Sequence, residues 1–175
     1  NYQEDPRSVV ANGTSPTNMG LSLLSNLAAY DFGYISAGNL IERNARALHT
    51  MKNLERFQGH FYNWYDIKML EPMHPRYIST VDSGNLAGHL LTLQQGQIEL
   101  MDQKILPEQA FLGLQDALQI IRDAIKDAAN GDGGPAADGR PADGNQGRIE
   151  PSDVIVQIDS FLAQLQSPPC NLSAA

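Results

Sequence analysis

Five stretches of this chain repeat apolar residues at helical spacing, and glycine- or proline-containing breaks separate them. This pattern constrains the fold most. The first stretch starts at Ser15, a suitable N-cap, and Pro16, which suits the first helical position, and it stops at Gly33. The second follows Ser36 so closely that the two should form an antiparallel hairpin ending near Gly59. Further helices are predicted after residues 82–84, at 107–130 and at 151–167, which gives a mainly all-α chain.

Two segments interrupt the helical pattern. Residues 60–80 crowd aromatic side chains together and contain Pro72 and Pro75, so a loop with a short β-hairpin is predicted there. Residues 131–150 are rich in Gly, Pro, Ala and Asp and predict a flexible loop. The expected organisation is one domain over 1–130, this loop, and a last helix of the same domain at 151–167. Gly88, inside the third predicted helix, suggests a close helix contact.

Composition excludes several classes of function. The formal net charge of -8 disfavours nucleic acid as a partner, because phosphate binding needs clustered Lys and Arg. No apolar run approaches the roughly 20 residues that cross a bilayer, so no membrane span is expected. Cys170 is the only cysteine, which rules out an internal disulfide, and the four histidines lack metal-ligand spacing, so neither a metal nor a cofactor is predicted. The polar start NYQEDPR, without an initiating Met, suggests a segment cut from a longer protein.

The first candidate cluster is polar and lies before and at the first helix. It joins NYQEDPR, with Glu4 and Arg7, to TSPTN, with Thr14 and Asn18. Unpaired N–H groups at a helix start can bind polar ligands. The alternative is that the charged residues are simply solvated and that Thr14 to Asn18 only cap the helix.

The second candidate cluster is HFYNWYD, residues 60–66. Tyr62 and Trp64 can stack on sugar rings, and Asn63 and Asp66 can bind sugar hydroxyls. The same aromatics could instead pack a hairpin onto the core. Alternation along an extended segment would send Phe61, Asn63 and Tyr65 to one face and Tyr62, Trp64 and Asp66 to the other, so one face could be core and the other a site.

The third candidate cluster is STVDSGNLAG, which carries Asp82 and Asn85. A carboxylate at the start of a helix is favoured by the helix dipole, so Asp82 as a plain N-cap is the structural alternative. The functional interpretation is that Asp66 and Asp82 flank the same loop. Two carboxylates that converge on one pocket are what glycosyl transfer requires.

In this order, NYQEDPR, TSPTNMGLSLLSNLAAYDFGYIS, GHFYNWYD and YISTVDSGNLAGHLLTL make about the first hundred residues resemble the glucoamylase-like region of cyclic β-1,2-glucan synthases. These are large bacterial enzymes of several domains, associated with the inner membrane. The resemblance implies a fold of six helical hairpins in an (α/α) toroid, of which this chain is a partial segment. It also implies that the region closes the glucan ring by transglycosylation.

The resemblance also implies a substrate site and partners. It carries Asp82 over as a sugar-site carboxylate, with Asp66, Tyr62 and Trp64 beside it, and it assigns no catalytic acid or nucleophile. The expected partners are β-1,2-linked glucan and the remaining domains of the parent enzyme, with this segment soluble and cytoplasmic. Two alternatives stay open, namely a non-catalytic helical glucan-binding module and a structural scaffold. The remaining candidate residues for hydroxyl contacts are Asn63, Asn85, Glu4, Arg7, Thr14 and Asn18.

Overall fold

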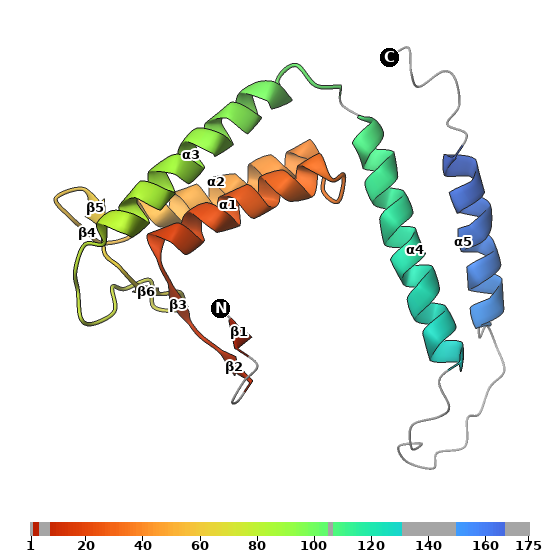
Figure 1. Ribbon diagram of the computed structural model, residues 1–175, viewed down its shortest axis with the longest axis horizontal. Helices are drawn as coiled ribbons and strands as arrows, with labels where there is room; N and C mark the ends of the chain where they lie inside the picture. The colour runs from red at the N-terminus through yellow and green to blue at the C-terminus, as the bar shows by residue number, and fades with distance from the viewer. Residues whose placement is uncertain (1, 4–7, 105–106, 131–149, 167–175) are drawn as a thin grey trace. The chain divides into compact units, whose positions relative to one another are not determined.

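The computed structural model describes residues 2–3, 8–104, 107–130 and 150–166, and the chain divides into two compact units, Asn1–Ala110 and Phe111–Ala175. The first unit holds helices α1, α2 and α3, and the second holds α4 from Phe111 onward together with α5 (Figure 1). The prediction of a mainly helical chain is confirmed. The helices are α1 Pro16–Asp31, α2 Ala37–Asn53, α3 Thr80–Leu100, α4 Glu108–Asn130 and α5 Pro151–Leu165.

Three two-stranded antiparallel pairs accompany the helices in the described residues. In the first unit, β1 (Tyr2–Gln3) pairs with β2 (Val9–Val10), β3 (Gly13–Thr14) pairs with β6 (Tyr65–Asp66), and β4 (Arg56–Phe57) pairs with β5 (His60–Phe61). The β4–β5 hairpin turns at Gln58 and Gly59, which both have positive φ. One prediction is corrected, because the second helix was expected to run to near Gly59, whereas α2 ends at Asn53 and residues 56–61 form this hairpin.

The starts of the first two helices follow the sequence prediction. Ser15 caps α1, and its Oγ accepts a hydrogen bond of 3.3 Å from the backbone N–H of Asn18. Pro16 occupies the first helical position, where a missing N–H costs nothing. Ser36 caps α2 in the same way, with a 3.2 Å bond from the N–H of Asn39. Gly33, with φ of 76°, lies just past the end of α1.

The third helix begins earlier than predicted. Ser79 is the N-cap of α3, and its Oγ accepts a 3.1 Å hydrogen bond from the backbone N–H of Asp82. Asp82 is therefore the third residue of the helix, and the alternative in which it is the N-cap is wrong. The physical reason is that the hydroxyl of Ser79, three residues earlier, accepts the hydrogen bond from the backbone N–H of Asp82. The side chain of Asp82 is therefore available for other partners.

Helix α1 packs against both of its neighbours in the first unit. Thr17 of α1 bonds Asp82 near the start of α3, and Tyr30 at the end of α1 bonds Gln103 just past the end of α3, so α1 and α3 run parallel. Helix α2 is antiparallel to α1, as the predicted hairpin requires (Figure 1). The buried core consists of Met19, Leu23, Leu27, Tyr30, Leu40, Met51, Leu54, Tyr65, Leu86 and Leu93.

Two glycines allow α1 and α3 to approach closely. A Cβ atom added at Gly20 would overlap the ring of His89, and one added at Gly96 would overlap the side chain of Leu27. The sequence pointed instead to Gly88, and this prediction is wrong within the described residues. A Cβ atom at Gly88 would meet nothing within 4 Å.

The second unit pairs two helices. Nε of Arg122 on α4 lies 2.7 Å from Oδ1 of Asp159 on α5, and Ile158 is buried. Both helices lie where the sequence predicted them. The predicted loop at 131–150 lies outside the described residues except for residue 150, as does Cys170. Among the helices described here, none has the length and apolar content to cross a membrane.

Candidate functional site

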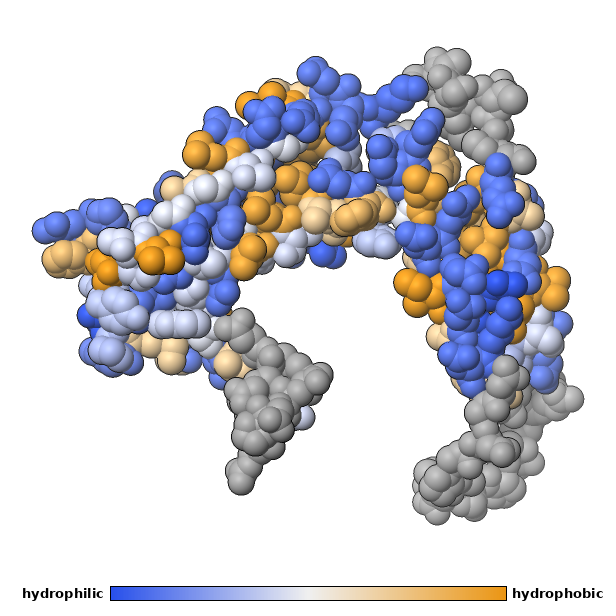
Figure 2. Space-filling model, in the orientation of Figure 1, coloured by the Kyte–Doolittle hydropathy of each residue, from blue (hydrophilic) through white to orange (hydrophobic). Residues whose placement is uncertain are grey.

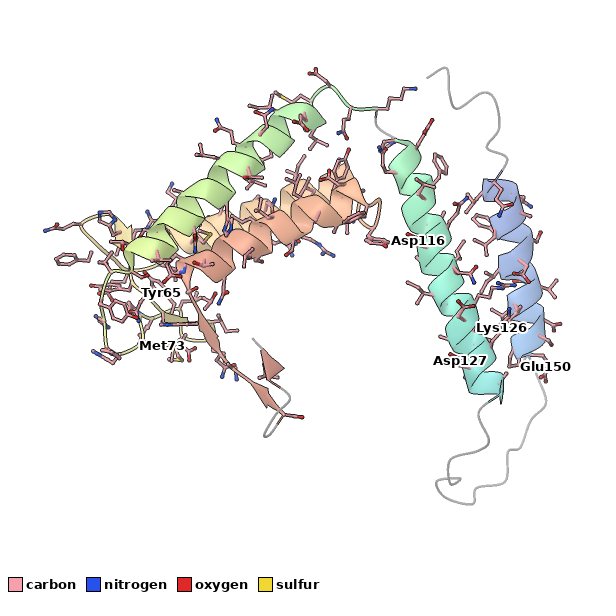
Figure 3. The ribbon with its side chains drawn as sticks, viewed as in Figure 1. Tyr65, Met73, Asp116, Lys126, Asp127 and Glu150 are labelled. Carbon is pink, nitrogen blue, oxygen red and sulfur yellow. The ribbon has the colours of Figure 1, made fainter. Side chains whose placement is uncertain are left out.

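The candidate residues of the described chain gather at one end of the first unit. Helices α1 and α3 both start at this end, and α2 finishes there, because α2 is antiparallel to the other two. The strand pair β3–β6 and the loop that leads into α3 lie at the same end (Figure 1). The labelled residues Tyr65 and Met73 of this region appear beneath the first turns of α1 and α3 in Figure 3. Parallel packing of α1 and α3 thus brings together segments that are more than 60 residues apart.

One face of the HFYNWYD segment belongs to the core. Asn63 and Tyr65 are 4% and 1% exposed. The hydroxyl of Tyr65 donates to the backbone oxygen of Glu55 at 2.7 Å and accepts from the N–H of Tyr62 at 2.9 Å. Oδ1 of Asn63 accepts from the N–H of Tyr77 at 3.4 Å. The predicted alternation is confirmed on this face, where the side chains fix the loop.

The opposite face carries Trp64 and Asp66, but Tyr62 packs against the core, with its ring centre 6.4 Å from that of Tyr65, so the predicted alternation fails at Tyr62. The guanidinium carbon of Arg76 lies 5.7 Å from the centre of the Tyr62 ring, a cation–π contact. Trp64 is 38% exposed, although it is a large aromatic residue. Its position is fixed through the backbone, because its carbonyl accepts a 2.9 Å hydrogen bond from the N–H of Met73. This face leaves an indole partly open to solvent.

A cleft of about 540 Å³ lies beside Trp64. Its wall combines the indole with amide, carboxylate and imidazole groups, which can stack on and hydrogen-bond to a polar ring. The lining residues are Ala11, Asn12, Gly13, Asn63, Trp64, Asp66, Met73, His74 and Pro75.

Asp66 holds a turn as well as lining this cleft. Its Oδ1 accepts hydrogen bonds from the backbone N–H groups of Met69 at 2.9 Å and Lys68 at 2.7 Å. These bonds, that of Met69 first, hold the pKa of the Asp66 carboxyl below its ordinary value. Asp66 is therefore ionised at neutral pH and is suited to accepting hydrogen bonds from hydroxyl groups, not to donating a proton.

A second cleft, of about 270 Å³, lies on the other side of the β3–β6 pair and also has Asp66 in its wall. Thr14 and Asn18, two of the predicted site residues, line it together with Ser22 and Thr50. Most of the rest of its wall is apolar, from buried side chains such as Met19 and Met51 and from the exposed Ile67 and Leu70. Successive strand residues thus face different clefts, since Gly13 lines the larger one and Thr14 the smaller.

Asp82 lies in a separate hydrogen-bonded cluster. Its Oδ1 accepts a 2.6 Å bond from the hydroxyl of Thr17, and Nδ2 of Asn85 donates to the same Thr17 oxygen at 3.1 Å. Burial raises the pKa of the Asp82 carboxyl, but hydrogen bonds from the hydroxyls of Ser79, Thr17 and Ser15 outweigh it, so the pKa lies below its ordinary value. The carboxylate thereby links the first turns of two helices.

The structure brings some predicted site residues together and separates others. Trp64, Asn63 and Asp66 share the larger cleft, whereas Asp82 and Asn85 line neither cleft. Glu4 and Arg7 lie outside the described residues.

Sequence reasoning missed several residues of these sites. Thr17 is the partner of Asp82, and its place in the first turn of a helix was the available signal. In the larger cleft, no local pattern marks the remaining lining residues, which are Ala11, Asn12, Gly13, Met73, His74 and Pro75.

The described residues were also compared with the side-chain groups that bind metal ions. They contain no group of three or more His, Cys, Asp or Glu side chains placed to share an ion.

Comparison with known proteins shows a similarity to a curated enzyme. No protein-family model matches the chain. Over 128 residues, 73% of the chain, it is 41% identical to the cyclic beta-(1,2)-glucan synthase NdvB of Rhizobium meliloti. The match spans 4% of the length of that synthase. Over most of its length, this chain is thus similar in sequence to a short segment of a cyclic β-(1,2)-glucan synthase.

Proposed function

We propose that the chain is a segment of a cyclic β-1,2-glucan synthase and forms part of the glucan-binding cleft of the domain that closes the ring by transglycosylation. Two observations support the assignment to this parent. The chain is 41% identical to a curated synthase over 128 residues. Its motifs NYQEDPR, GHFYNWYD and STVDSGNLAG also resemble the glucoamylase-like region of that family.

The observation that carries the binding role is the Trp64 cleft. A partly exposed indole offers the apolar face that pyranose C–H groups stack on. Asn12 and Asp66 lie beside it in the cleft wall and offer hydrogen-bonding groups for sugar hydroxyls. The volume of about 540 Å³ is in the range of small-molecule sites. The cleft is thus suited to one or more sugar units of a neutral chain.

The helix arrangement supports the proposed toroid. In a ring of successive helical hairpins, every second helix runs in the same direction, and the loops at one end form the binding surface. Helices α1 and α3 are parallel neighbours with α2 antiparallel to α1, and the candidate residues lie at one end of them. The chain supplies a few helices of such a ring, and the parent supplies the rest.

Glycosyl transfer needs two carboxyl groups on either side of the scissile bond. Asp66 is the carboxylate that lines the cleft, and its lowered pKa is suited to a binding or stabilising role. Asp82 is engaged with Thr17, so its proposed sugar contact depends on glucan reaching the first turns of α1 and α3. The proton donor is proposed to come from the remaining domains of the parent.

A non-catalytic glucan-binding or scaffold module is the second candidate. It is favoured by the hydrogen bonds that both carboxylates accept from their own chain. The two candidates differ in what loss of Asp66 does in the full-length parent. Asp66→Asn should abolish ring closure if the domain is catalytic, and should only weaken glucan binding if it is not.

Titration of the chain with linear β-1,2-glucan tests the binding role. Trp64 is the only tryptophan of the 175 residues, so tryptophan fluorescence, excited selectively over that of the tyrosines, reports on this site alone. A saturable change is expected with β-1,2-glucan and not with a β-1,3-glucan of equal length. Calorimetry then compares Trp64→Ala, which should lose binding, with Trp64→Phe, which keeps an aromatic face. A wild-type chain that gives neither heat nor a fluorescence change would contradict the proposal.

A further inference from the structure

We infer that Gly13 is a positioning residue for Trp64: the missing side chain at position 13 lets the indole lie against strand β3 and fixes the aromatic wall of the larger cleft. The ligand in this inference, a β-1,2-glucan, rests on the proposed function. The positioning itself rests on contacts alone.

The contacts are close and specific. A Cβ atom at Gly13 would lie 3.3 Å from Cε3 and 3.7 Å from Cζ3 of Trp64, and 3.5 Å from Sδ of Met73. The six-membered ring of the indole therefore lies directly over the Gly13 α-carbon. Ordinary carbon–carbon contacts are at about 3.5–4.0 Å, so a methyl group here would displace the ring by a few tenths of an ångström.

Backbone conformation does not explain a glycine at this place. Gly13 is a strand residue opposite Asp66 in the β3–β6 pair, and it does not have the positive φ of Gly33 and Gly59. Any L residue adopts this backbone, and β-branched residues favour it. The close approach of the indole is thus the physical reason for glycine.

The indole has to yield if a side chain is added. The backbone of Trp64 is held by the hydrogen bond from the N–H of Met73 at 2.9 Å, and its neighbour Asn63 is held by a 2.9 Å bond to the oxygen of Tyr77. Gly13 is fixed by pairing with Asp66. Because both backbones are tied, the strain falls on the half-exposed indole, which turns toward solvent and reshapes the cleft wall.

The test is a graded series at position 13. Gly13→Ala and Gly13→Val add one and three carbon atoms, and Val raises strand propensity, so a loss cannot come from the backbone. The matched control is Gly84→Ala, since a Cβ atom at Gly84 meets nothing within 4 Å. The readouts are the emission maximum and acrylamide quenching of Trp64 without ligand, the Kd for linear β-1,2-glucan by calorimetry, and the melting temperature.

Emission should shift to the red and quenching should increase from wild type to Ala to Val, while Gly84→Ala matches wild type. Val should weaken glucan binding roughly tenfold, the upper range for one aromatic contact. Unchanged emission and unchanged quenching in both variants would overturn the inference. If Val does not fold, Ala decides the outcome. If emission shifts but the wild-type chain binds no glucan, the positioning role stands and the proposed function fails.

Discussion

At the scale of single residues, Asp82 shows how one carboxylate can link two helices by a hydrogen bond. It is the third residue of α3, so its own N–H is already satisfied by Ser79. The side chain accepts a hydrogen bond from the hydroxyl of Thr17 in the first turn of α1. Both helix starts carry partial positive charge, which a carboxylate stabilises. The structural contribution of Asp82 is therefore larger than that of a simple cap.

Asp82 and Thr17 should make stability depend on pH in the acid range. Because the folded-state pKa of Asp82 lies below that of the unfolded chain, about 3.9, its contribution is present above this value and is lost as pH falls through the folded-state pKa. Thr17→Val removes the hydroxyl and should lower the free energy of unfolding at pH 7 by roughly 1–2 kcal/mol. The free energy of unfolding of this variant should also fall less steeply between pH 7 and pH 2 than that of the wild type. Urea unfolding between pH 7 and pH 2 measures both effects.

Thr17→Ser is the matched control for this experiment. It keeps the hydroxyl and should follow the wild-type pH profile, whereas Asp82→Asn should resemble Thr17→Val. An acid profile of Thr17→Val that runs parallel to the wild-type profile would show that the hydroxyl does not lower the pKa of Asp82.

At the scale of elements, the contact between α1 and α3 depends on small residues on the facing sides. Gly20 leaves room for His89, and Gly96 leaves room for Leu27. The outward side of α3 has two more glycines, Gly84 and Gly88, whose surroundings are open. Glycines of one helix thus differ in what they do: some permit packing, and others only weaken the helix.

Alanine substitutions should separate these two kinds of glycine. Gly88→Ala should raise the free energy of unfolding by about 0.5–1 kcal/mol, since helix propensity improves and no atom is displaced. Gly20→Ala should lower it by about 1 kcal/mol or more, because the added methyl overlaps the His89 ring. Chemical denaturation followed by circular dichroism compares the two. A stabilising Gly20→Ala would mean that α1 and α3 separate at little cost.

At the scale of the whole molecule, each unit shows apolar side chains at its surface (Figure 2). On α3 of the first unit, Val81 is 71% and Leu91 67% exposed. In the second unit, Ile120 of α4 and Val156 of α5 are both 66% exposed. Surface of this kind is typical of contacts with other protein, in line with a segment that the parent enzyme would cover.

The isolated chain should therefore self-associate. Sedimentation velocity at increasing concentration is expected to show a rising weight-average mass. The double variants Leu91→Gln/Ile98→Gln and Ile120→Gln/Val156→Gln place polar groups on one unit each, and the variant that suppresses association identifies the unit responsible. A monodisperse monomer at all concentrations, with high thermal stability, would contradict this expectation.

The sequence by itself determined the local features of this protein. Ser15, Pro16 and Ser36 predicted two helix starts because capping involves residues only three apart. Alternation in HFYNWYD predicted that Asn63 and Tyr65 would lie on one face and Trp64 on the other, because side chains of an extended segment point to opposite faces in turn, but it did not say which face is buried.

Only the tertiary structure decided which of these residues meet. Asp82 bonds Thr17 across 65 positions of the chain, and Trp64 contacts Gly13 across 51. Both contacts follow from the parallel packing of α1 and α3 and from the β3–β6 pairing. No local pattern encodes them, because they depend on how far each helix is shifted along its neighbour. For the same physical reason, the close glycines were Gly20 and Gly96 and not Gly88.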